Sequence, residues 1–252
     1  MRIDLFLFEK GYVTSRERAK KLVADSRVSV NGKVITKPSY DVDDNDIVDV
    51  SKSETYEYVS RGGYKLEAAL DAFDIDVTGL YAADLGASSG GFCDCLLVRG
   101  ISKIFAVDCG SGQLVASVRD NPKVISLENT NARYITDETF GQKVDVVVMD
   151  LSFISQTLVF PAISRILKNG GVLVSLIKPQ FEVGKSNIGK NGIVKSSKAT
   201  DEAIKRVIEN AEYFGLCCRG TIVSPIKGGD GNTEYLAAFD FDENKNKNIG
   251  SI

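Results

Sequence analysis

The feature that most constrains the fold of this 252-residue chain is an alternation of two patterns between residues 61 and 242. Short runs rich in Val, Ile, Leu and Phe are typical of strands, and segments with apolar residues every three or four positions are typical of helices. The predicted strands are 81–85, 103–107, 124–127, 144–149, 171–177, 217–224 and 234–241. The predicted helices are 63–73, 90–99, 112–118, 156–168 and 198–214. This alternation predicts an α/β domain with a parallel sheet and crossover helices.

Residues 1–52 have a different pattern, which predicts a small separate α+β domain. A short apolar helix is followed by a second helix, which Thr14 opens and in which Glu17 completes a capping box. The dipeptide Asn31-Gly32 predicts a type I′ hairpin turn between two short strands rich in valine.

The remaining segments are assigned by their lack of pattern. Residues 53–60 are polar and predict a linker to the second domain, which spans residues 61–242. Residues 243–252 are rich in Asn and Lys, and we expect them to be frayed.

Composition excludes several classes of protein. Hydrophobic residues make up 43% and charged residues 26%, which is ordinary for a soluble globular protein and unlike a disordered one. The longest uncharged stretch, residues 151–164, is shorter than the roughly 20 apolar residues that a membrane-spanning helix needs. The first ten residues include Asp4 and lack the apolar region of a signal peptide. We therefore expect a cytoplasmic protein without membrane association.

The reactive side chains narrow the chemistry. The five cysteines show no CxxC spacing, so we expect buried thiols without a disulfide framework and no metal site. The chain has no histidine, which excludes Ser–His–Asp and Cys–His catalytic groups. Proton transfer would then use Lys, Asp, Glu, Tyr or Cys, with a pKa shifted toward neutrality.

Positive charge is concentrated near the N-terminus. Residues 10–37 carry a balance of +6 and residues 38–50 a balance of −5, against −3 for the whole chain. By itself, the basic helix is either a solvated face or a surface for a polyanion. The segment RIDLFLFEKGYVTSRERAKKLVADSRVSVNGKVI resembles the small RNA-binding domain of ribosomal protein S-four, tyrosyl-tRNA synthetases and pseudouridine synthases. The resemblance implies that the second helix and the hairpin lie along an RNA backbone. The candidate RNA-binding residues are Arg16, Arg18, Lys20, Lys21, Arg27 and Lys33.

A glycine-rich turn follows the first strand of the larger domain. Gly86, Gly90 and Gly91 lie between that strand and a helix, so a ligand can approach the backbone and the free N–H groups of the helix. The spacing is neither the G-x-G-x-x-G of NAD enzymes nor a Walker loop. Asp108 ends the next strand, where a carboxylate can hold both ribose hydroxyls. The alternative is a tight structural turn, but the combination favours a nucleoside cofactor without a pyrophosphate, such as S-adenosylmethionine.

Seven motifs in order resemble those of the TlyA family, whose members are often called hemolysin A and whose second domain resembles the FtsJ ribose methyltransferases. The motifs are RGGYKL, DLGASSGGF, AVDCGSGQL, ENTNAR, VVVMDLSFIS, SLIKPQFE and GNTEYLA. The resemblance covers nearly the whole chain. It implies S-adenosylmethionine-dependent 2′-O-methylation of cytidine in ribosomal RNA, with ribosomal RNA or ribosomal subunits as partners. It also implies a class I, Rossmann-like methyltransferase fold with a seven-stranded, mostly parallel sheet whose last strand is antiparallel.

The resemblance also implies roles for individual residues. The family's catalytic Lys–Asp–Lys–Glu tetrad matches Lys65, Asp150, Lys178 and Glu234. The cofactor-binding residues match Gly86, Ser88, Gly90, Asp108 at the ribose and Asn131 near the adenine, with Asp84 as a contact to the methionine amine through the loop. The chain departs from related enzymes at Ser89, where many have proline, which leaves the detailed shape of the loop open.

The chemistry of ribose methylation fits these side chains. The hydroxyl must lose a proton, and a free lysine with a pKa of about 10.4 is a poor base near pH 7. A neighbouring ammonium such as Lys65, with partial desolvation, would lower the pKa of Lys178, whereas Asp150 would hold its ammonium in place and Glu234 would orient Lys65. The alternative is that two lysines and two acids form only a structural ion-pair network.

Asp84, Asp108, Asp150 and Lys178 all lie at predicted strand ends, so we expect them to meet at one edge of the sheet. The glycine-rich segment 182–195 predicts either a lid that contacts RNA phosphate or a plain flexible loop. Two rival functions are a membrane-active cytolysin, as the hemolysin name suggests, and an RNA-binding module with an inactive methyltransferase fold. The sequence leaves the oligomeric state open.

Overall fold

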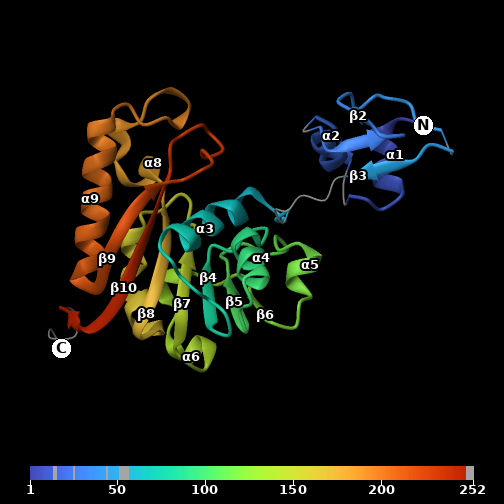
Figure 1. Ribbon diagram of the computed structural model, residues 1–252. Coiled ribbons are helices and arrows are strands. Elements are labelled where there is room, and N and C mark those ends of the chain that lie inside the picture. The colour runs from blue at the N-terminus through green and yellow to red at the C-terminus, as the bar shows by residue number, and fades with distance from the viewer. Residues whose placement is uncertain (14–15, 25, 44, 51–56, 248–252) are drawn as a thin grey trace. The chain divides into compact units, whose positions relative to one another are not determined.

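A computed structural model describes residues 1–13, 16–24, 26–43, 45–50 and 57–247 of the chain. It divides into two compact units, Met1–Glu57 and Tyr58–Ile252, which are described separately (Figure 1). No helix within the described ranges is long and apolar enough to cross a bilayer.

The small unit packs two helices against a three-stranded antiparallel sheet in the order β2-β1-β3. Its elements are α1 (Ile3–Glu9), α2 (Arg16–Ala24), β1 (Val28–Val30), β2 (Lys33–Ile35) and β3 (Val48–Val50). Ala19, Leu22 and Val23 of α2 are buried with Ile3, Leu7 and the inward-facing valines of β1. Asn31 and Gly32 have φ of 50° and 77°, which confirms the type I′ turn. The capping box at Thr14 lies outside the described residues.

The large unit is built on a seven-stranded sheet in the order β6-β5-β4-β7-β8-β10-β9. The strands are β4 (Tyr81–Leu85), β5 (Lys103–Val107), β6 (Val124–Leu127), β7 (Val144–Met149), β8 (Leu167–Ile177), β9 (Phe214–Val223) and β10 (Tyr235–Asn246). Neighbouring strands from β6 to β8 pair in parallel, and β10 is antiparallel to both β8 and β9. This confirms the predicted α/β class and the antiparallel last strand.

Helices cover both faces of this sheet, as the alternation of buried strand residues requires. Ala82, Val146 and Val148 point to a core beneath α3 and α4, which lie over the same face (Figure 1). Ala83 and Val147 point to the opposite core, beneath α7 and α9. The helices are α3 (Arg61–Ala72), α4 (Gly91–Val98), α5 (Ala116–Arg119), α6 (Asp137–Phe140), α7 (Phe160–Ile166), α8 (Pro179–Glu182) and α9 (Ser197–Tyr213). Short 3₁₀ turns occupy Ala132–Tyr134, Gln156–Leu158, Lys185–Asn187 and Lys190–Gly192.

Several predicted boundaries differ from the structure. The helix predicted over 156–168 is a 3₁₀ turn followed by α7, because Pro161 lies in the first turn of α7 and cannot continue an earlier helix. The strand β8 begins at Leu167 rather than residue 171. The last strand extends through Asn246, which pairs with Phe214, so residues 243–246 are not frayed; residues 248–252 lie outside the described part.

The predicted linker is also shorter than expected at its C-terminal end. Tyr58 is buried, and the Val59 N–H donates to the Asp94 carboxylate at 2.8 Å. The Ser60 hydroxyl caps α3 by accepting from the Gly62 N–H at 3.3 Å. Residues 58–60 therefore belong to the large unit, because their backbone and side chains help to fix the start of α3.

Candidate active site

The carboxyl ends of four neighbouring strands form the base of the candidate site. Gly86 follows β4, Asp108 follows β5, Asp150 follows β7 and Lys178 follows β8. Two adjoining cavities open at this edge, with volumes of ≈ 210 and ≈ 370 Å³. Gly86, Ser88 and Asp150 line both of them. The two cavities therefore lie on either side of the glycine loop and the end of β7, as neighbouring parts of one site.

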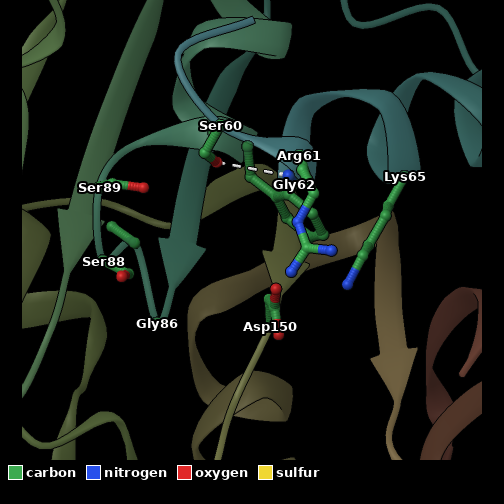
Figure 2. A pocket seen from close by; sticks show the side chains of 11 residues that line it. Ser60, Arg61, Gly62, Lys65, Gly86, Ser88, Ser89 and Asp150 are labelled. Atoms are coloured by element: carbon green, nitrogen blue, oxygen red, sulfur yellow. Dashed lines mark hydrogen bonds between the residues drawn. The ribbon is translucent and has the colours of Figure 1, made fainter. Parts of the chain in front are cut away.

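The smaller cavity lies between the glycine loop and the start of α3. Its lining includes Ser60, Arg61, Lys65, Ser89 and Phe92. Figure 2 shows the Arg61 guanidinium and the Lys65 side chain directed into it, with Asp150 below them. The cavity therefore has two cationic groups on one side and the glycine loop, with Ser88 and Ser89, on the other.

The larger cavity lies at the ends of β5 and β7. Asp108, Asn131 and Phe153 contribute to its lining, together with Cys109 and Arg133. Its residues mix a carboxylate and an amide with apolar surface. That combination suits a nucleoside, in which a polar sugar is joined to a flat base.

The glycine loop has a backbone that only small residues permit at two positions. Gly86 has φ 89°, and a Cβ there would lie 2.4 Å from the backbone oxygen of Asp150. Gly90, the N-cap residue of α4, has φ 93°. The Gly90 N–H donates to the Ala87 carbonyl at 2.7 Å, so the turn closes with Ser89 at the position where many relatives have proline.

Asp108 fixes the shape of this loop. One carboxylate oxygen accepts from the Ser88 N–H at 2.8 Å, and the other accepts from the Gly110 N–H at 2.7 Å. Each oxygen retains a second lone pair, which leaves acceptor capacity for a ligand hydroxyl. The structure thus brings together Gly86, Ser88 and Asp108 around one cavity, with Asn131 on its far wall.

Asp84 lies beneath the loop rather than in either cavity. It is fully buried, and the Cys93 thiol donates to its Oδ2 at 3.0 Å, while Oδ1 has no hydrogen-bond partner among the described residues. Burial raises the pKa of Asp84 to about 7, and the nearby Asp150 and Asp108 carboxylates act in the same direction. Its expected contact to a methionine amine stays a prediction, since the side chain lines no cavity.

The four residues of the predicted tetrad form two ion pairs. The Lys65 Nζ lies 2.6 Å from Oε2 of Glu234, and both side chains are buried although the residues are 169 positions apart in the sequence. The Lys178 Nζ lies 2.6 Å from Oδ1 of Asp150 and donates to the Ser152 hydroxyl at 2.8 Å.

Strand pairing explains why these pairs are close together. Tyr235 at the start of β10 pairs with Ile177 at the end of β8, so Glu234 and Lys178 occupy the next positions on adjacent strands. Lys178, with a carboxylate and a hydroxyl beside it, is held in one orientation, as acid–base chemistry on a bound hydroxyl requires. Lys178 itself lines neither cavity, but its partner Asp150 lines both.

Sequence patterns missed a residue with unusual geometry. Phe153 has φ 67° and is 88% exposed, and its ring centroid lies 5.3 Å from that of Phe181. A bulky residue in the left-handed region with its ring in solvent is uncommon, and such strain often marks a functional site. Hydrophobic periodicity could not identify Phe153, because the residue type alone shows neither the exposure of the side chain nor the backbone φ. The sequence signal was its place, three residues after Asp150.

In the small unit, the basic candidates differ in their contacts. Arg16 binds the buried Asp4 at 3.0 Å, and Arg27 binds Glu57 at 3.0 Å. Although burial works to raise the pKa of Asp4, hydrogen bonds from Arg2 and Arg16 hold that pKa below its usual value. Lys33 is exposed and Lys20 half-buried. The side chains of Arg18 and Lys21 lie outside the described part of the structure.

Comparisons with known proteins match both units. The model of the S4 domain matches residues 1–48, and that of the FtsJ-like methyltransferases matches residues 58–241. The 16S/23S rRNA (cytidine-2′-O)-methyltransferase TlyA of Mycobacterium tuberculosis is 41% identical over 93% of this chain and 88% of its own length. Hemolysin A of Brachyspira hyodysenteriae is 39% identical over 95% of this chain and 99% of its own.

A solved structure from Streptococcus thermophilus that carries a hemolysin name is 39% identical, with a TM-score of 0.73, and covers 96% of this chain and 89% of that one. The matched ranges therefore span both units and contain all the residues that line the two cavities. The chain belongs to the FtsJ-like methyltransferase family and, within it, to the TlyA proteins, which join such a domain to an S4 domain.

Proposed function

We propose that this chain transfers a methyl group from S-adenosylmethionine to the ribose 2′-hydroxyl of a cytidine in ribosomal RNA. The observation that carries this proposal is the pairing of Lys65 with Glu234 and of Lys178 with Asp150, because Lys65 lines the smaller cavity and Asp150 lines both. The substrate named for the Mycobacterium tuberculosis relative is consistent with this chemistry.

The residues present fit S-adenosylmethionine. Gly86 leaves no room for a side chain where the loop approaches Asp150, and the carboxylate of Asp108 faces the cavity that suits a nucleoside. Asn131 would contact the base and Asp108 the ribose, while the Ser88 side chain would face the methionine portion. The bound cofactor supplies an electrophilic methyl group on a sulfonium, so most of the acceleration comes from positioning.

Lys178 is the proposed base. During methyl transfer the hydroxyl proton would pass to the Lys178 Nζ, which must first have given up its own proton, and then to solvent. Asp150 and Ser152 orient that nitrogen. Glu234 holds the Lys65 side chain, which lines the smaller cavity.

Phe153 and the S4 unit would supply RNA contacts. An exposed ring beside the larger cavity offers a face on which a base can stack. The S4 unit would bind the RNA backbone through its exposed lysines. The domains that match are an S4 domain and a methyltransferase, so the hemolysin names of relatives are not carried over to this chain.

The primary test is transfer of a tritiated methyl group to purified ribosomal subunits, followed by mapping of the modified nucleotide. We expect label in ribosomal RNA as a 2′-O-methylcytidine. Methylation of a base, or no label with either subunit or with intact ribosomes, would contradict the proposal.

Cofactor binding has an independent test in Cys109, an exposed thiol that lines the larger cavity. S-adenosylhomocysteine should slow alkylation of Cys109, measured by mass spectrometry. The half-buried Cys217, which lines neither cavity, serves as the internal control. Equal alkylation of Cys109 with and without S-adenosylhomocysteine would argue against a nucleoside in that cavity.

A further inference from the structure

The loop that joins β9 to β10 is folded around the side chain of Glu234. We refer to residues 224–234 as the glutamate loop. The Ser224 N–H donates to the Glu234 carbonyl at 2.9 Å and closes its base. Gly228 packs on the carboxylate so closely that a Cβ there would lie 2.6 Å from Oε1. The position of this carboxylate therefore depends on the shape of the glutamate loop.

Asn232 connects the glutamate loop to a second segment. Its side chain is buried, its Oδ1 accepts from the Val194 N–H at 3.1 Å, and its Nδ2 donates to the Gly192 carbonyl at 2.9 Å. Its own carbonyl accepts from the Gly228 N–H at 2.9 Å. One buried residue thus makes hydrogen bonds both within the glutamate loop and across to residues 192–194.

The second segment, residues 183–195, has a fixed form of its own, and we refer to it as the lysine loop. The Gly189 N–H donates to the Ile193 carbonyl at 2.7 Å, and Ile188 and Val194 form a β-bridge. Both apolar side chains pack against Val183 and the buried alanines of α9. The lysine loop directly follows α8, which begins one residue after Lys178. It is therefore anchored to the same end of the sheet as the proposed base.

We propose that Asn232 is a positioning residue that holds Glu234, and through it the Lys65 ammonium, in place beside Lys178. This inference rests on the proposed function. The ladder between β8 and β10 stops at Tyr235, and the Ser224 N–H still holds the Glu234 carbonyl, but strand pairing does not fix residues 225–233. Asn232 supplies the next fixed point by fastening them to the lysine loop. Loss of its amide leaves the Gly192 carbonyl and the Val194 N–H without their partner.

The test compares Asn232→Ala with Asn187→Ala. Asn187 is a matched control, because its Nδ2 donates to the Val183 carbonyl at 2.9 Å within the lysine loop and does not reach the glutamate loop. Asn232→Ala should lower kcat for methyl transfer by about 10-fold or more, with the dissociation constant for S-adenosylhomocysteine within about twofold of wild type. Asn187→Ala should change neither quantity by more than about threefold. An equal loss of cofactor affinity in Asn232→Ala would overturn the inference.

A double-mutant cycle separates positioning from a general structural effect. In a Glu234→Gln background, Asn232→Ala should lower kcat by less than about twofold more, because the carboxylate on which it acts is already gone. If the two losses multiply, Asn232 does not act through Glu234.

A labelling experiment gives a readout that needs no activity. Reductive methylation of the full chain, followed by mass spectrometry, measures the reactivity of Lys65, whose ammonium is buried against Glu234. Asn232→Ala and Glu234→Gln should both raise the labelling rate of Lys65, and Asn187→Ala should not. An unchanged rate in Asn232→Ala overturns the inference. If the rate responds but wild type methylates no RNA, the proposed function fails and the positioning role of Asn232 stands.

Discussion

The two units of this chain use their charged residues differently. In the large unit, Lys65 is paired with Glu234 and Lys178 with Asp150 beside two cavities, and three of these four side chains are less than 15% exposed. In the small unit, Lys33 and much of the Arg16 side chain face solvent. Paired and desolvated charges can fix reacting groups but offer little to a distant polyanion, whereas exposed cations do the reverse. We therefore expect that substitutions can change catalysis and RNA affinity independently, and each prediction below tests this expectation.

The largest expected effect is on the tetrad. Lys178→Ala should lower methyl transfer by roughly 1,000-fold or more, because it removes the proposed base, while leaving RNA affinity and cofactor affinity nearly intact. Lys168→Ala is the control: this lysine lies on the same strand and pairs with Asp145 at 2.6 Å, at the opposite end of the sheet. Single-turnover kinetics measure methyl transfer, and calorimetry measures the affinities for RNA and for the cofactor. Activity within a few-fold of wild type for Lys178→Ala would assign the base elsewhere.

Asp108 should show the next largest effect, on cofactor affinity alone. Asp108→Ala removes the acceptor of the Ser88 and Gly110 N–H groups as well as the proposed ribose contact, so S-adenosylhomocysteine binding should weaken by ~1–3 kcal/mol. Asp108→Asn keeps one acceptor oxygen and should lose less. Calorimetry shows which of the two variants loses more affinity for S-adenosylhomocysteine. The RNA affinity of both should not change. Wild-type affinity in Asp108→Ala would place the cofactor elsewhere.

The complementary change belongs to the small unit. Lys33→Glu with Lys37→Glu, both at exposed positions, should weaken binding to ribosomal RNA about 10-fold and reduce its salt dependence by about one phosphate per lost contact. Cofactor affinity should stay the same. Filter retention at several salt concentrations is the measurement, and an unchanged salt slope would mean that this surface is only a solvated face.

Arg16 should behave differently from these lysines. It holds the buried Asp4, so Arg16→Glu should lower the melting temperature of the small unit as well as its RNA affinity. Thermal melting curves and RNA-binding measurements on the same samples distinguish the structural role of Arg16 from its role in RNA binding. A variant that loses RNA affinity with an unchanged melting curve would show that Arg16 serves RNA alone.

Local patterns predicted much of the fold, because strands β4 to β7 are short apolar runs between clear turns and match the predicted ranges residue for residue. They could not predict tertiary pairing. Lys65 and Glu234 are 169 residues apart in the sequence, and the order of the strands brings them together. Only the family motifs predicted that they belong to one site. Likewise, the sequence of the first helix does not show that Asp4 is buried and binds Arg16, which gives this predicted RNA contact a structural role as well.

The smallest predicted effect on function concerns Asp84, which lines neither cavity and should change stability instead. Its unfolded pKa is close to 3.8 and its folded pKa is about 7, so between these values the folded chain binds a proton that the unfolded chain has lost. The free energy of unfolding should therefore fall as pH rises from about 4 to about 7. Asp4 contributes the opposite slope only below pH 3.8, because its pKa is lowered, so the two windows are distinct.

Asp84→Asn should flatten the decline between pH 5 and pH 8 and leave the variant more stable than wild type at pH 8, measured by urea unfolding, since the amide can fill the same space without an unpaired charge. Asp76→Asn is the control, because Asp76 is exposed with a lowered pKa and should not change the slope in that range. If wild type and Asp84→Asn decline equally, the carboxylate beneath the glycine loop is ionised at low cost, and some partner compensates it. The stability of the large unit would then depend on pH no more than that of the small unit, so pH dependence would not be a difference between the two units.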